Sequence, residues 1–205
     1  MSRTAEVRRA TTAATVVVRF AIDGRGRADA RTGVAGFDEL LECFAAHGRF
    51  DLDVEAAGTA AHAHRLVIAT GAALGEAFGR AVGPREVTRG LGEASVPVAG
   101  ALVRAVCDLG EGTQGVLAWH AAPPAWQLVG DYDVSLTPEV WQAFALEARV
   151  TLHLDLLRGE HGRHITRATY AAAARALASA AERDPRVAGG LPGAGGEGWG
   201  GAAPR

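Results

Sequence analysis

The short segments HAHR at residues 62–65 and HGRH at residues 161–164 each lead into a long Ala-rich stretch, and they lie about a hundred residues apart. Each segment follows a predicted strand and begins a predicted helix, at 64–80 in the first case and 162–183 in the second. Two short His motifs can coincide by chance, but their matching place in the order of elements favours duplication of one unit. The sequence therefore predicts two similar halves.

The other predicted elements follow the same order in both halves. In the first half, apolar spacing predicts strand, strand, helix, strand and helix, at 16–23, up to Ala30, 36–47, 50–56 and 64–80. The second half repeats this order at 102–109, 116–120, 138–147, 150–157 and 162–183. We expect an α/β fold (α+β, sandwich-like) whose halves, 3–90 and 91–192, pack as one domain, with a disordered Gly-rich tail at 193–205.

Composition narrows the classes of function. The chain has 205 residues, of which 48% are hydrophobic, and this composition suits a buried core. The formal charge of −2 gives no reason to expect nucleic acid or a membrane as partner. Lys is absent, which excludes Schiff-base chemistry on a lysine. The apolar surroundings of Cys43 and Cys107 favour two buried reduced thiols over a disulfide. We expect a soluble, cytoplasmic protein.

Several strings stand in a characteristic order: TGVAGFDELL at 32–41 with HG at 47–48, TGAALGEA at 70–77, VGDYD at 129–133, TLH at 151–153 and GEHGRHI at 159–165. Together they resemble landmarks of imidazoleglycerol-phosphate dehydratases, the lyases that remove water from a phosphorylated imidazole glycerol in histidine biosynthesis. The first string is similar to the family's T-G-(I/V)-x-F-F-D-H-M-L, and TGAALGEA to the segment after its D-H-H-x-x-E-D motif. The resemblance covers about residues 3–192.

The resemblance implies an α/β protein of two similar halves that assembles into large symmetric oligomers. It also implies paired Mn(II) ions between subunits, held by His and Glu from both repeats. We therefore expect a homo-oligomer, and the positions of those metal ligands decide what chemistry remains.

Most of the implied metal ligands are replaced. The family's His-His-x-x-Glu reads HRLVI at 64–68 in the first repeat and RHITR at 163–167 in the second. One ligand of three remains in each repeat. A further family His corresponds to Glu39, which can still coordinate, and His153 keeps a ligand position on its strand.

The substituted residues oppose metal binding. Such a site needs neutral imidazoles and a carboxylate one helical turn apart, whereas a guanidinium stays protonated in proteins and never becomes a ligand. A unit positive charge about 4 Å from a dication would cost on the order of 8 kcal/mol at an effective dielectric of ~20. We expect no cofactor, with a residual single Mn site on His64, His153 and His164 as the alternative.

Other positions of the family pattern differ as well. The family's E-T pair is AA at 13–14, an expected Arg corresponds to Thr113, an expected Lys is Ala171, and S-T-K-G reads GAGG at 193–196. Arg89 keeps a position at which the resemblance implies contact with phosphate. Metal, acid–base and phosphate groups are thus lost together, which points away from the parent reaction.

The arginines at the former ligand positions allow two interpretations. Arg65, Arg163 and Arg167, with Arg89, predict a pocket that binds a phosphate or carboxylate of a small metabolite by bidentate hydrogen bonds. The alternative, which we favour, is that they pair with acidic residues and replace the metal at an interface: Glu39, Glu42 or Glu160. His62 and His161 are expected to be exposed loop residues.

Three functions remain, in order of preference. The first is a divergent family member without the two-metal dehydration, a pseudoenzyme candidate that binds a small anionic ligand or a partner. The second is a repurposed enzyme of specialised metabolism that uses Glu39, His153 and His164 as proton carriers without metal. The third is a true dehydratase with a reduced metal site.

Overall fold

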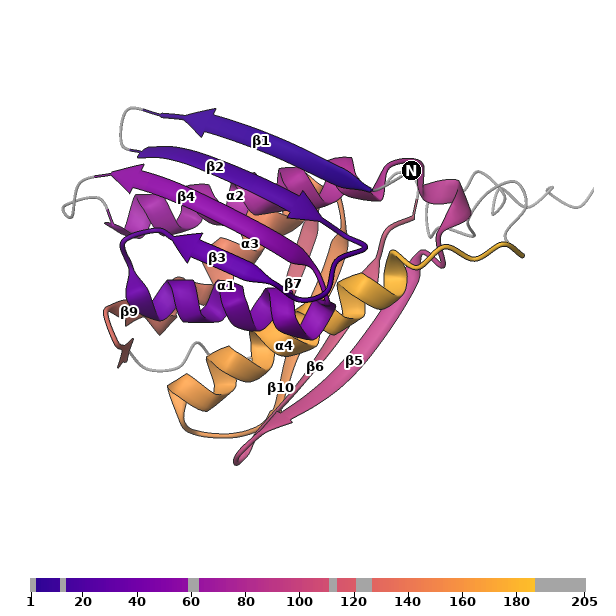
Figure 1. The fold of residues 1–205 in the computed structure, drawn as a ribbon. Helices are drawn as coiled ribbons and strands as arrows, with labels where there is room; N and C mark the ends of the chain where they lie inside the picture. The colour runs from indigo at the N-terminus through magenta and orange to yellow at the C-terminus, as the bar shows by residue number, and fades with distance from the viewer. Residues whose placement is uncertain (1–2, 12–13, 59–62, 111–113, 121–126, 187–205) are drawn as a thin grey trace, which may run out of the picture.

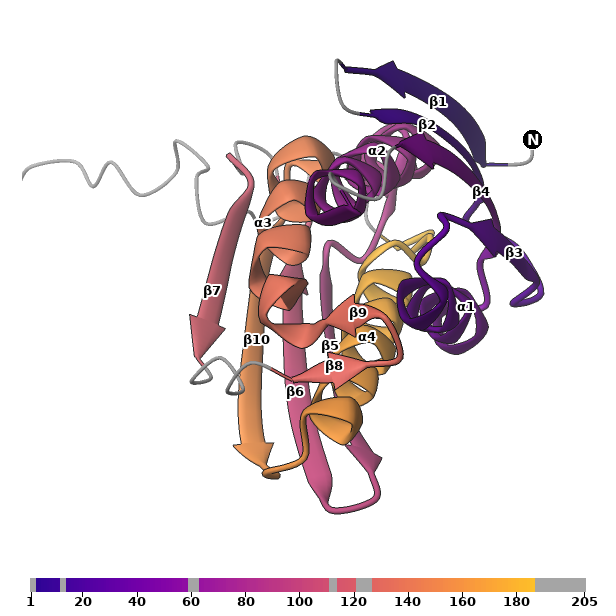
Figure 2. The same cartoon turned by 90° about the vertical axis from the view of Figure 1, so that its left-hand side faces the viewer.

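The computed structural model describes residues 3–11, 14–58, 63–110, 114–120 and 127–186. Two four-stranded sheets enclose a layer of four helices (Figure 1), and the view from the side shows helices between the sheets (Figure 2). The predicted α/β fold, sandwich-like and built from two similar halves, is confirmed.

The first half runs from β1 to α2. Its sheet has the order β1-β2-β4-β3, in which β1, β2 and β4 are antiparallel neighbours and β3 is parallel to β4. Val16, Val18 and Phe20 alternate along β2 and bury one face of this sheet against the helices. The bounds are β1 Thr4–Ala10, β2 Ala14–Ala21, β3 Ala28–Arg31, α1 Ala35–Gly48, β4 Asp51–Gly58 and α2 Ala63–Val82.

The second half repeats this topology. Its sheet has the order β5-β6-β10-β7, again with one parallel pair, β7 and β10, at the same place. The duplication is therefore visible in strand order and direction, while the exact division at residues 90 and 91 stays a prediction. The bounds are η2 Arg85–Val87, β5 Leu91–Val98, β6 Ala101–Asp108, β7 Val116–His120, β8 Leu128–Val129, β9 Tyr132–Asp133, η3 Val134–Leu136, α3 Thr137–Ala148, β10 Thr151–Arg158 and α4 Gly162–Ala180.

The predicted order of elements was wrong in two respects. Each half begins with an additional strand, β1 or β5, which lies at the edge of its sheet. Both are edge strands with few buried side chains: Val7 is the one buried residue of β1, and β5 contains Gly92 and Pro97. Such strands lack the apolar alternation on which sequence prediction depends. The second half also contains the short hairpin β8–β9.

The helices of the two halves pack against each other, α1 beside α4 and α2 beside α3. In the second of these pairs, Gly71, Gly75 and Gly79 recur every fourth residue along α2 and face the backbone of α3. Small residues at this spacing let two helix backbones approach closely, so both halves contribute to one core.

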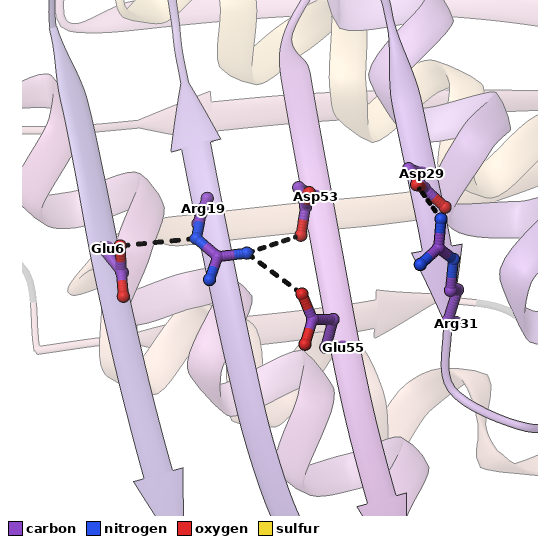
Figure 3. A network of polar contacts seen from close by, with 6 residues as sticks. All are labelled: Glu6, Arg19, Asp29, Arg31, Asp53 and Glu55. Atoms are coloured by element: carbon purple, nitrogen blue, oxygen red, sulfur yellow. Dashed lines mark hydrogen bonds and ion pairs between the residues drawn. The ribbon is translucent and has the colours of Figure 1, made fainter.

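Charged residues cover the outer face of the first sheet. The guanidinium of Arg19 lies 3.1 Å from the Asp53 carboxylate, 3.2 Å from Glu55 and 3.4 Å from Glu6 (Figure 3). These side chains are 43% to 63% exposed, and such exposed pairs contribute about 0–1 kcal/mol each. The network therefore marks a solvated face rather than a source of stability.

Cys43 and Cys107 are both buried and carry free thiols, as predicted. None of the helices in the described part of the chain is long and apolar enough to span a membrane.

Candidate functional site

The first turns of α1 and α4 bring together two positions at which the resemblance implies metal ligands. Glu39 on α1 forms an ion pair with Arg163 on α4, with 3.7 Å between Oε2 and Nη2. The two helices run side by side in the same direction, since Cys43 lies against Arg167 and His47 against Arg175 further along. A charge pair therefore occupies these two positions within one chain.

Arg167, one turn after Arg163, adds positive charge to the α1–α4 interface. Its side chain is exposed, and its carbonyl accepts a hydrogen bond from the Cys43 thiol at 3.9 Å. Burial raises the pKa of Cys43, which Arg167 opposes. Burial and then the charges of Arg175 and Arg167 lower the pKa of His47, so this imidazole is neutral at pH 7 and accepts from Arg175 Nε at 3.2 Å.

The start of α4 borders a cleft of about 630 Å³. The main-chain N–H of Gly162 donates to Gln127 Oε1 at 2.9 Å, so this side chain satisfies one of the unpaired N–H groups of the helix N-terminus. The rings of His161 and His164 lie 5.1 Å apart at the same place. The cleft is lined by Gly100, Ala101, Gln127, Arg158, Gly159, Glu160, His161 and His164.

His153 occupies a different surface. It lies on β10 with its exposed side chain directed away from the buried Leu152 and Leu154, and its ring stacks on His120 of β7 at 5.8 Å. The helical layer lies on the other face of this sheet. Within one chain, His153 is therefore separated by the sheet from Glu39 and His164, with which we grouped it as a proton carrier.

The four arginines of the predicted anion pocket do not meet within one chain. Arg89 pairs with Glu182 at 2.9 Å, beyond the end of α4, which places it about 25 Å along that helix from Arg163. His64 and Arg65 are exposed in the first turn of α2. Arg163 and Arg167 alone are brought together. A pocket containing all four would have to form between chains, and it stays a prediction.

Arginines stand at three of the positions at which the resemblance implies metal ligands, Arg65, Arg163 and Arg167, and a guanidinium does not coordinate a metal ion. Within one chain, and among the described residues, no three His, Cys, Asp or Glu side chains are placed to hold a metal ion, whereas the resemblance implies sites between subunits. Arg163 lies 3.7 Å from Glu39, and Arg167 stands at the position where the resemblance implies a carboxylate. Ala171, where the family pattern has Lys, is fully buried. No reaction step through Mn(II) follows from this donor set.

Sequence reasoning missed two features of the site, and some predictions lie outside the described residues. Gln127 and the His120–His153 stack depend on contacts between segments far apart in the chain, which no local pattern indicates. The predictions for His62, Ala13, Thr113 and the tail 193–205 concern residues that the structure does not describe.

Comparison with known proteins agrees with this architecture. A family model described as imidazoleglycerol-phosphate dehydratase matches residues 32–177. A protein of that name from Gluconacetobacter diazotrophicus is 41% identical over 192 residues, 93% of this chain and 96% of its own, and one from Salinispora tropica is 42% identical over 200 residues, 94% and 97% of the two chains.

The fold of this chain is also similar to that of two solved structures. The crystal structure of imidazoleglycerol-phosphate dehydratase from Staphylococcus aureus superposes with a TM-score of 0.77 at 24% identity, covering 88% of this chain and 99% of the other. That of the Pyrococcus furiosus protein in complex with (S)-C348 has a TM-score of 0.75 at 25% identity, covering 88% and 96%. From the family model and the curated relatives, this chain belongs to the imidazoleglycerol-phosphate dehydratase family.

Proposed function

We propose that this chain is a family member that no longer carries out dehydration on paired Mn(II) ions, and that its α1–α4 surface binds a small anionic metabolite or a second copy of the chain. The observation that carries this proposal is the Glu39–Arg163 ion pair. It places a permanent cation at one former ligand position and uses the carboxylate of another. The loss of two ligands and the gain of one positive charge both weaken the binding of Mn(II) at these positions.

The family relatives are named as dehydratases, which makes a dehydratase with a reduced metal site the main competitor. Its weakness is chemical, because a guanidinium cannot lose its proton to coordinate a metal. A metal-free enzyme that uses Glu39, His153 and His164 is the other competitor. Its proton carriers lie on different surfaces of one chain, so it needs a second subunit to bring them together.

Anion binding at this surface rests on Arg163 and Arg167. Arg163 is 60% exposed and its partner Glu39 is 58% exposed, so the pair is weak and can open for a stronger acceptor. A phosphate or carboxylate held by two guanidiniums gains bidentate hydrogen bonds that are roughly twice as strong as neutral ones. In a homo-oligomer the same arginines can instead pair with carboxylates of a neighbouring subunit.

The test combines metal analysis with a variant that restores ligands. We expect purified protein to contain far less than stoichiometric Mn and to leave imidazoleglycerol phosphate unchanged. The double variant Arg163→His/Arg167→Glu recreates His-His-x-x-Glu, and it is expected to bind Mn(II) more tightly than wild type by isothermal titration calorimetry. Stoichiometric Mn in the wild-type protein together with turnover would refute the proposal.

A second arm addresses the ligand. Phosphorylated and carboxylated metabolites are screened by thermal shift against wild type and Arg167→Ala, with Arg31→Ala on the exposed edge strand β3 as the matched control. We expect a stabilising anion whose effect is lost in Arg167→Ala and kept in the control. If no anion stabilises the protein and Arg167→Ala disturbs assembly alone, the ligand part is wrong and the assembly part stands.

A further inference from the structure

A second cluster of arginines lies where β1, the end of α2, η2 and the end of α3 meet, and none of its residues belongs to α1 or α4. It lines a cleft of about 400 Å³. Glu76 is 11 residues after Arg65 on α2, so the cleft lies on the order of 16 Å along that helix from its first turn. Six charged side chains line the cleft: Arg9, Arg80, Arg85, Arg149, Glu76 and Glu147.

Both carboxylates of the cleft are engaged by two of the arginines. Arg9 Nε lies 3.1 Å from Glu76, and its Nη2 lies 2.7 Å from Glu147. Arg80 pairs with the other oxygen of Glu76 at 2.5 Å. Since Glu76 and Glu147 are 23% and 31% exposed, these pairs are partly shielded from water and hold the floor of the cleft in place.

Arg85 adds a further guanidinium to the lining of the cleft. Its guanidinium donates to the carbonyls of Leu109 at 3.1 Å, Arg149 at 2.6 Å and Ala148 at 2.5 Å, and so caps the C-terminus of α3. Burial lowers the pKa of Arg85, and the nearby charge of Arg149 lowers it further. The four guanidiniums and two carboxylates that line the cleft give it a formal charge of +2.

Arg149 lies at the end of α3, in the left-handed conformation with which helices commonly end. Its φ is 51°, a conformation that Gly adopts without strain, and its main-chain N–H donates to the carbonyls of Ala145 and Leu146. Arg49 occupies the equivalent place after α1 with φ of 56° but lies on another surface of the protein. Arg49 is therefore an internal control for Arg149, because it has the same backbone conformation but lies outside the cleft.

We propose that this cleft binds the phosphate group of a small phosphorylated metabolite, held by the guanidiniums of Arg80 and Arg149 and supported by Arg85. A phosphate monoester carries a charge of about −1.5 to −2 at pH 7, which matches the formal charge of the cleft. Guanidiniums suit it because they donate two parallel hydrogen bonds to its oxygens. This site is separate from the one under Proposed function and does not depend on it.

The experiment uses inorganic phosphate as the probe on the full chain, in buffers whose ionic strength is matched with chloride. Phosphate at ten times its Kd is expected to raise Tm by about 3–6 °C, and acetate, a monoanion, by much less. Arg149→Gly should abolish the phosphate effect, whereas Arg49→Gly should keep it. Because Gly accepts the backbone conformation at both positions, both variants keep the fold, with Tm in chloride within about 2 °C of wild type.

Two outcomes would overturn the inference. One is the absence of any phosphate shift above the chloride control in wild type. The other is an unchanged shift in Arg149→Gly. If that unchanged shift is lost in Arg167→Ala, phosphate binds at the α1–α4 surface instead and the proposed function stands.

Discussion

Asp131 holds the start of α1 although it lies 96 residues from Ala35 in the sequence. Its carboxylate accepts hydrogen bonds from the main-chain N–H of Gly36 at 2.8 Å and of Ala35 at 3.0 Å. The N-cap residue itself, Val34, offers no side-chain cap, so the β8–β9 hairpin supplies the missing acceptor. The cap positions the turn of α1 that carries Glu39.

Replacement of this carboxylate gives the first prediction. The N–H groups of Gly36 and Ala35 lower the pKa of Asp131, so the folded state favours the ionised form. Its stabilising contribution is therefore complete above the unfolded-state pKa near ~3.9 and is lost as pH falls through the lower folded-state value. Asp131→Asn removes the negative charge at the helix N-terminus and leaves one amide oxygen as acceptor, so it is expected to destabilise by about 1 kcal/mol at pH 7. The difference from wild type should shrink below about pH 4.

Urea unfolding at several pH values measures this difference. The control is Asp29→Asn, whose carboxylate pairs with exposed Arg31 on β3, and it should change stability by less than about 0.5 kcal/mol. A constant difference between Asp131→Asn and wild type from pH 7 to pH 3 would contradict the capping role.

Single residues also show which features of the site could be predicted from the sequence. Pairing of the arginines with Glu39, Glu42 or Glu160 at an interface was one of two interpretations. The structure contains one such pair, Arg163–Glu39, within a single chain, and pairing across an interface stays a prediction. The roles of Gln127 and Asp131 could not be predicted, because each depends on a contact between a helix and a loop far apart in the chain. Gln127 contacts Gly162 within the second half, and Asp131 contacts Ala35 and Gly36 of the first half. Local patterns indicate which groups exist, whereas long-range contacts decide which of them meet.

At the scale of elements, α2 and α3 depend on the glycines of α2. A Cβ on Gly75 would lie 2.3 Å from the carbonyl oxygen of Phe144, which is backbone and cannot easily move, while a Cβ on Gly79 would lie 3.2 Å from that of Ala148. Gly to Ala in a helix interior normally stabilises by about 1 kcal/mol. Overpacking costs about 1–3 kcal/mol, so the two positions should respond differently.

We expect Gly75→Ala to destabilise by about 1–2 kcal/mol net, because the clash outweighs the gain in helix propensity. Gly79→Ala should lie within about 0.5 kcal/mol of wild type, since its neighbour needs to shift by a few tenths of an ångström. Thermal unfolding of both variants at one pH measures the contrast. Equal stability of the two variants would mean that the helices separate freely and that α2 and α3 are not closely packed.

The same scale shows which elements a sequence can reveal. Strands such as β2 and β6 alternate buried and exposed residues and were predicted, as were all four long helices. The edge strands β1 and β5 were not, because a strand that buries few side chains carries little periodic signal. The duplication was nevertheless readable, since the two His segments precede equivalent helices.

At the scale of the whole molecule, stability depends on the contacts between the two halves more than on the similarity of the halves. Aromatic side chains of the first half contact those of the second in five places: Phe37–Tyr132, Phe37–Tyr170, Phe44–Trp141, Phe44–Phe144 and Phe78–Phe144. All of these side chains are buried. Separating the halves would expose this cluster to water, at about 25 cal/mol for each Å² of apolar surface.

The halves are therefore expected to unfold as one cooperative unit, although each repeats the other's topology. Trp141 is 1% exposed and lies between the halves, so its fluorescence reports on their separation when the other three tryptophans are replaced by Phe. Urea unfolding followed by this fluorescence and by far-ultraviolet circular dichroism should give coincident transitions. The fragment 3–90 alone should lack stable tertiary structure. Two separated transitions, or a folded fragment 3–90, would show instead that each half has a core sufficient for folding. The positions at which the resemblance implies metal ligands come from both halves, and they would then be held together by assembly alone.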